Sequence, residues 1–130
     1  MAAPTVATYS AAALVAANTS FKDLIDAGAG AGSIKIRDAA DVLLAQIPLT
    51  DPCGTVNGTT GQLTITPSGR DESADATGTA AYGEFCDSDG LVHLSLPAQA
   101  GSAAVSGKLV INSLSIAAGG PVEVLSATVG

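Results

Sequence analysis

The side chains best suited to catalysis are few, and the single histidine is the first of them. His93 stands in an alternating stretch, residues 91–96, where Val92, Leu94 and Leu96 share one face of a strand and His93 lies on the other. A catalytic histidine needs a nucleophile to activate and a carboxylate to orient its ring. No serine of the chain stands in the Gly-x-Ser-x-Gly pattern of a nucleophile elbow. We therefore expect no catalytic role for His93.

Acidic side chains form two local groups that could attract a cation. Asp87 and Asp89 stand two residues apart in the sequence Asp-Ser-Asp-Gly, which could begin a calcium loop. Such a loop needs further oxygen ligands and a late glutamate, whereas apolar residues follow here, so we expect a hairpin turn without structural calcium. The acidic run at residues 71–75 is expected to be a solvated loop.

Cys53 and Cys86 are the only cysteines. Two separate reduced thiols are the favoured interpretation, and a disulfide between two strand ends stays open because spacing alone does not decide it. One histidine beside two cysteines is too few for a zinc site. The sequence thus predicts neither a metal nor a cofactor, and it does not predict an enzyme.

Composition indicates a protein that works through its surface. Ala, Gly, Ser and Thr fill about half of the 130 positions, aromatic residues make up 3%, and the net charge is −7. The five cations, which do not cluster beyond one pair, are Lys22, Lys35, Arg37, Arg70 and Lys108. Without a basic face the chain is not expected to bind nucleic acid or an anionic membrane surface.

The beginning of the chain lacks a basic segment followed by an apolar one, so no cleaved signal peptide is expected. The apolar run at residues 11–17 is too short to span a bilayer. Residues 1–17 have no clear period and are expected to form an N-terminal arm, followed by one β-rich domain over residues 18–130.

One short helix is expected at about residues 20–27. Phe21, Leu24 and Ile25 follow helical spacing, with Asn18 or Ser20 as the N-cap. Gly28 ends the helix.

Beyond the helix, short alternating stretches between turn signals predict strands. The expected strands are residues 33–37, 42–49, 61–66, 77–87, 91–96, 108–112, 114–117 and 122–129. Seven to eight short antiparallel strands predict a mainly β fold, a small sandwich or barrel. The expected core comprises Ile34, Ile36, Leu63, Ile65, Leu94, Leu109, Ile111 and Val124.

Five stretches carry a resemblance to a known group of proteins: residues 21–38, 43–52, 74–80, 87–90 and 116–124. Together they resemble small proteins encoded beside the major capsid gene in tailed bacteriophages, and the resemblance covers residues 18–130. These are turn and strand motifs, so they identify a scaffold rather than an active site.

The resemblance implies a capsid decoration, or cement, protein that binds the outer head surface and stabilises the shell. It implies the major capsid protein and other copies of the chain as partners. It also implies synthesis in the bacterial host cytoplasm and residence on the virion. The alternative is a receptor- or glycan-binding module of a head or tail fibre, for which a chain with no Trp and two Tyr is poorly equipped.

Large apolar residues in the arm suggest contacts with a partner. Val6, Tyr9, Leu14 and Val15 have no evident use in a solvated tail. We expect these four residues to contact the capsid or an adjacent copy.

Overall fold

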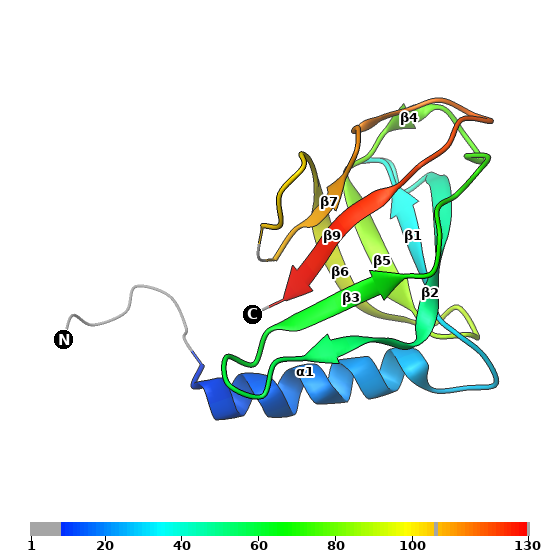
Figure 1. Cartoon of the computed structure of the whole chain (residues 1–130). Helices are drawn as coiled ribbons and strands as arrows, with labels where there is room; N and C mark the ends of the chain where they lie inside the picture. Colours follow the sequence, from blue (N-terminus) through cyan, green and yellow to red (C-terminus); the bar gives the residue numbers. More distant parts are fainter. Residues whose placement is uncertain (1–8, 106, 130) are drawn as a thin grey trace.

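The computed structural model describes residues 9–105 and 107–129, which form one helix and nine strands. Their bounds are α1 (Ala11–Asp26), β1 (Ser33–Arg37), β2 (Leu43–Val56), β3 (Leu63–Pro67), β4 (Gly78–Thr79), β5 (Tyr82–Cys86), β6 (Val92–Ala100), β7 (Leu109–Ile111), β8 (Ser115–Ile116) and β9 (Val124–Val129). Seven strands close into a barrel in the order β1-β2-β3-β9-β7-β6-β5, and β4 pairs with β8 in a separate ribbon (Figure 1). The prediction of a small, mainly β fold is confirmed, and the barrel is the form it takes.

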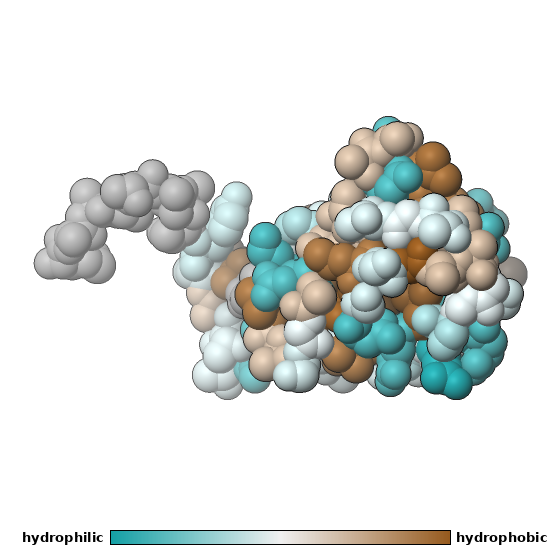
Figure 2. All heavy atoms as spheres, turned by 90° about the horizontal axis from the view of Figure 1, so that it is seen from above, coloured by the Kyte–Doolittle hydropathy of each residue, from teal (hydrophilic) through white to brown (hydrophobic). Residues whose placement is uncertain are grey.

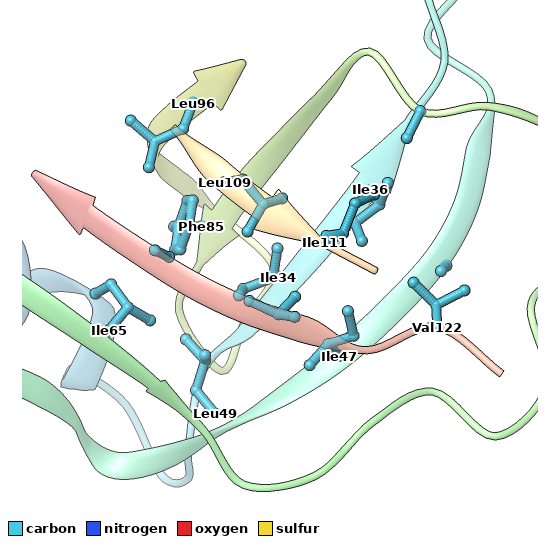
Figure 3. Close-up of a cluster of buried hydrophobic side chains, with 14 of the residues drawn as sticks. Ile34, Ile36, Ile47, Leu49, Ile65, Phe85, Leu96, Leu109, Ile111 and Val122 are labelled. Carbon is cyan, nitrogen blue, oxygen red and sulfur yellow. The ribbon is translucent and has the colours of Figure 1, made fainter. Parts of the chain in front are cut away.

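Side chains inside the barrel come from strands with clear alternation. In β1, Ile34 and Ile36 are fully buried while Lys35 between them points outward. Of the eight residues expected in the core, seven are buried, and Leu94 is half-buried against the same cluster. Figure 3 shows part of this buried cluster, with Phe85, the largest fully buried side chain, between strands that also carry Ile34, Ile65 and Leu109. Outside, small and apolar residues show between hydrophilic ones on the face seen from above (Figure 2).

The second strand is longer than expected, because its turn-like residues form a bulge instead of ending it. The first half of β2 pairs with β1, and its second half pairs with β3. Between them the register with β3 jumps from Leu49 opposite Pro67 to Gly54 opposite Ile65. The extra residues bend the strand, so β2 turns a corner of the barrel just after residue 49, where the expected strand ended.

One pairing departs from the expected antiparallel pattern. Residues 98–100 of β6 run parallel to β7, with Ala98 opposite Leu109 and Ala100 opposite Ile111. The first residue of β7, Leu109, therefore lies beside Ala98 of β6. Strand patterns give face and length but not direction, so the sequence could not distinguish the two pairings here.

The helix begins at Ala11 and not near residue 20, so residues 11–17, which we assigned to the arm, are its first two turns. Ser10 is the N-cap, and its Oγ accepts a hydrogen bond from the Ala13 amide at 3.1 Å. Alanine is the best helix former but carries little hydrophobic period, which explains the missed start. The helix ends at Asp26, and Gly28 follows with φ +105°.

The face that α1 turns to the barrel comprises Leu14, Asn18, Phe21 and Ile25. Asn18 and Ile25 are buried and the other two are half-buried, whereas Leu24, expected on this face, is 47% exposed.

A polar contact fixes the middle of α1 to the barrel. Asn18 is 2% exposed, and its Nδ2 donates to the carbonyl oxygens of Gly61 at 2.6 Å and Val129 at 3.2 Å. Gly61 has φ +79°, and a Cβ there would collide with the side chain of Leu14. The glycine thus lets the turn before β3 approach the helix closely, and Asn18 ties that turn and the end of β9 to α1.

Replacing Ile36 by alanine should lower the free energy of unfolding by about 2–5 kcal/mol, because a fully buried side chain leaves a cavity. Chemical denaturation measures the loss. Lys35→Ala, on the outward face of the same strand, should cost much less. Equal losses in the two variants would contradict the register of β1.

Replacing Asn18 by alanine should cost about 1–3 kcal/mol, because two carbonyl oxygens lose their donor at a buried position. The neighbouring Thr19→Ala, exposed on the same helix, is the matched control and should change stability by less than about 0.5 kcal/mol. An Asn18→Ala variant as stable as the wild-type protein would show that α1 docks by its apolar contacts alone.

Candidate functional site

A groove of about 650 Å³ runs over the outer faces of β1 and β2. Its walls are the segment at residues 71–75 and the turn at residues 87–90. Four aspartates, which the sequence placed in two separate loops, line it: Asp71, Asp75, Asp87 and Asp89. Lys35 reaches the same groove from β1. The barrel therefore brings the two predicted acidic groups to one place.

Asp71 uses its carboxylate to hold one wall of the groove. Its Oδ2 accepts a hydrogen bond from the Gln46 amide at 2.9 Å, and its Oδ1 accepts one from the Ser73 amide at 3.0 Å. Its own backbone pairs with Val122 in both directions. Asp71 thus fastens the segment at residues 71–75 to β2 and to the stretch before β9.

Asp87 organises the other wall in the same manner. Its Oδ1 accepts hydrogen bonds from the amides of Asp89 at 2.9 Å and Leu91 at 3.0 Å. Its Oδ2 lies 3.0 Å from Nε2 of His93. Gly90 closes the turn with φ +86°. The predicted hairpin turn is confirmed.

The pairing of Asp87 with His93 is the contact that the sequence reasoning missed. The hydrogen bond from His93 holds the pKa of Asp87 below its usual value, with the amides of Leu91 and Asp89 adding to the effect. The His93 side chain is only 13% exposed. Asp87 and His93 flank the hairpin turn, so the register of that turn is the feature of the sequence that could have predicted their contact. The pair serves to close the turn.

Both cysteines are free and buried. The Cys53 amide donates to Oδ1 of Asp26 at 2.7 Å, while Oδ2 of the same carboxylate lies 3.1 Å from Nζ of Lys22. Burial, helped by the nearby Asp26, raises the pKa of the Cys53 thiol to about 12, and burial also raises the pKa of Cys86. A thiol must ionise to attack or to bind a metal, so both act here as small packing residues.

A further polar cluster joins the turn after β1 to β5. The Tyr82 hydroxyl donates to Oδ1 of Asp41 at 2.6 Å, and this bond is the main reason that the pKa of Tyr82 rises to about 12. Arg37 pairs with Glu84 and also donates to the Asp41 carbonyl at 3.1 Å. Phe85 is buried while Tyr82 is half-buried. This cluster, too, is engaged in internal bonds.

Across residues 9–105 and 107–129, no group of three or more His, Cys, Asp or Glu is placed to hold a metal ion. The arrangement in the groove offers hydrogen-bond acceptors and one ammonium group, with two of its four carboxylates serving as turn caps. It can attract a polar or cationic group by hydrogen bonding and charge.

The residues expected to contact a partner fall into three situations. Tyr9 is 71% exposed, just before the N-cap of α1. Leu14 and Val15 are half-buried and lie against the turn at Gly61 within the same chain. Val6 lies outside the described residues. Of the expected contact residues, Tyr9 is thus the one whose side chain the structure shows largely open to a partner.

The fold and the groove define the class of the molecule as a small closed β-barrel with one helix packed on it. In comparisons of sequence and of fold, the chain matches no protein family, no curated protein and no solved structure. No helix within the described part of the chain is long and apolar enough to cross a membrane.

The free energy of unfolding of the Asp87→Asn variant should depend less on pH in acid than that of the wild-type protein. Because the pKa of Asp87 is lowered in the folded state, its hydrogen bonds stabilise the fold fully at pH values above the ordinary pKa of 3.8. This stabilisation is lost as the pH falls through the lowered pKa. Unfolding free energies measured from neutral pH downward should therefore decline less steeply in this variant.

Asp89→Asn, exposed in the same turn, is the matched control and should keep the decline of the wild-type protein. Identical acid profiles for Asp87→Asn and the wild-type protein would contradict the structural role of the Asp87–His93 pair.

Proposed function

We propose that the protein is a structural component of a bacteriophage virion, a capsid decoration protein that binds the outer surface of the head and stabilises the shell. The observation that carries the proposal is the use of the reactive side chains. The thiols of Cys53 and Cys86 are buried, His93 closes a hairpin turn, and Tyr82 is bonded to Asp41. Because these side chains are engaged in internal contacts that hold the barrel together, their use supports a function exerted through contact surfaces.

Rigidity supports the same proposal. Seven strands close into a barrel. Asn18 joins the helix to the turn before β3 and to the end of β9. A cement protein acts statically, because its bound interfaces oppose the outward pressure of packaged DNA. A closed barrel suits such a load, because closure leaves none of its seven strands as an unpaired sheet edge. The resemblance over residues 18–130 supplies the biological setting.

A receptor- or glycan-binding module of a head or tail fibre is the alternative. Sugar-binding modules of this size usually stack exposed aromatic rings on the sugar. Here Phe85 is buried, Phe21 and Tyr82 are half-buried, and only Tyr9 among the four aromatic residues is largely exposed. The groove beside Lys35 offers polar groups but no aromatic ring. The decoration role is therefore favoured.

Copy number on purified particles separates the two proposals. A decoration protein should be recovered with virions in a fixed ratio to the major capsid protein, and particles stripped of it should break at lower temperature or osmotic stress. Adding back the purified protein should restore both the ratio and the resistance. A copy number matching the few fibres or the single tail of a particle would overturn the decoration role and support the alternative.

A further inference from the structure

The turn between β2 and β3 contains the one asparagine of the chain that is followed by glycine. Asn57 and Gly58 lie just after the end of β2, and both are exposed. A main-chain nitrogen can attack the side-chain amide carbon of the asparagine before it, and glycine hinders this attack least because it has no Cβ. The pair therefore has the residue types that favour loss of the asparagine side-chain amide.

The attacking nitrogen is unengaged in the folded chain. Among the described residues, the Gly58 amide donates no hydrogen bond, and a Cβ at this position would meet no atom within 4 Å beyond its chain neighbours. The comparable pair Asp89–Gly90 differs, because the Gly90 amide donates to the Asp87 carbonyl at 3.0 Å. The fold thus leaves the amide after Asn57 free to react and holds the amide after Asp89 in a hydrogen bond.

The turn also polarises the carbonyl group that would be attacked. Oδ1 of Asn57 accepts hydrogen bonds from the amides of Thr59 at 2.8 Å and Thr60 at 3.0 Å. When a nitrogen adds to Cγ of Asn57, negative charge develops on this same oxygen. Two backbone N–H groups already point at it and stabilise that charge, so the turn favours the addition.

We propose that Asn57 is a site of spontaneous deamidation in the folded protein. The Gly58 nitrogen forms a bond to Cγ and gives up its proton, while the bond from Cγ to Nδ2 breaks and Nδ2 leaves with that proton as ammonia. Solvent water then opens the cyclic imide. Attack of water at Cγ gives aspartate, and attack at the main-chain carbonyl carbon gives isoaspartate.

The isoaspartate product alters the turn that holds α1. Its chain runs through the former side-chain carbon, so the backbone is lengthened and the former main-chain carbonyl becomes a free carboxylate. In the unmodified turn that carbonyl accepts the Gly61 amide at 2.8 Å, and the Asn57 amide donates to the Gln62 carbonyl at 2.8 Å. The Gly61 carbonyl in turn accepts from Asn18 of α1. Isoaspartate at position 57 should therefore loosen the attachment of α1 to the barrel.

Deamidation is independent of the proposed function, because it changes the chain with time whatever surface the protein binds. It is tested on the purified protein without particles. An unreactive Asn57 would leave the decoration role untouched, and a failure to bind capsids would leave the modification site untouched.

Incubation of the purified protein at neutral and mildly alkaline pH, followed by peptide mapping with mass spectrometry, tests the site. The peptide that contains Asn57 should lose ammonia and gain water, and enzymatic methylation should label its isoaspartate. Conversion should be faster at the higher pH, because the attack requires loss of the Gly58 amide proton. Asn112, which is exposed but followed by serine, and Asn18, which is buried in α1, should remain largely unconverted over the same period.

Gly58→Ala is the variant that isolates the chemistry from the fold. The open space and the absence of a positive φ at Gly58 should let alanine fit, whereas its Cβ should slow conversion by at least about tenfold. Gly69→Ala is the matched control, because Gly69 is also exposed, has open space around it and has no positive φ. This control should convert at the rate of the wild-type protein.

Asn57→Asp separates the effects of the two products. Its carboxylate can still accept the amides of Thr59 and Thr60, so the variant should unfold at nearly the same denaturant concentration as the fresh wild-type protein. Incubated wild-type protein should unfold at a lower concentration, in proportion to its isoaspartate content.

Two results would overturn the modification site: an unchanged Asn57 after incubation, and equal rates of conversion in the wild-type protein and Gly58→Ala. A protein rich in isoaspartate at position 57 but as stable as the fresh protein would refute the effect on the attachment of α1.

Discussion

The bend in β2 is the constraint on which the rest of the structure depends. One strand pairs with β1 through its first half and with β3 through its second, so it belongs to both sides of the barrel. Residues 50–53 provide the extra length at the corner. Without this shared strand, β1 and β3 would each become an edge, and their backbone groups would need another partner.

Closure has consequences for the residues outside the barrel wall. With few large side chains in the chain, the core relies on Phe85 and a set of isoleucines and leucines, and each must be kept from water on all sides. The helix covers part of the wall through Phe21 and Ile25. The stretches before and after β4 and β8 hold together through backbone bonds such as those between Ala74 and the glycines at 119 and 120. The polar groups of the groove anchor these connections.

Much of the fold was readable from local pattern. Alternation predicted β1 to the residue, and the Asp-Ser-Asp-Gly turn between β5 and β6 formed as expected. The helix start was missed because Ala11 to Ala17 are good helix formers without a strong apolar period. The expected strand ended at residue 49, because only the pairing with β3 shows that the chain continues to Val56 as a bulged strand.

The site was less predictable, because its parts come from distant segments. The sequence indicates Asn18 as a possible helix cap, whereas the partners of its side chain, Gly61 and Val129, lie 43 and 111 residues away. The groove exists only because β1 and β2 bring residues 71–75 and 87–90 to the same outer face. The strands β3, β9, β7 and β6 contain no Asp, Glu, Lys or Arg, and only the strand order of the barrel shows that these four strands are neighbours.

This grouping of uncharged strands on one side of the barrel also gives the molecule an electric dipole. A body with carboxylates on one half and none on most of the other experiences a torque in the field of any strongly negative object. As it approaches such an object, it turns its acidic half away before the two surfaces touch. In a collision with such an object, β3, β9, β7 and β6 therefore meet it first.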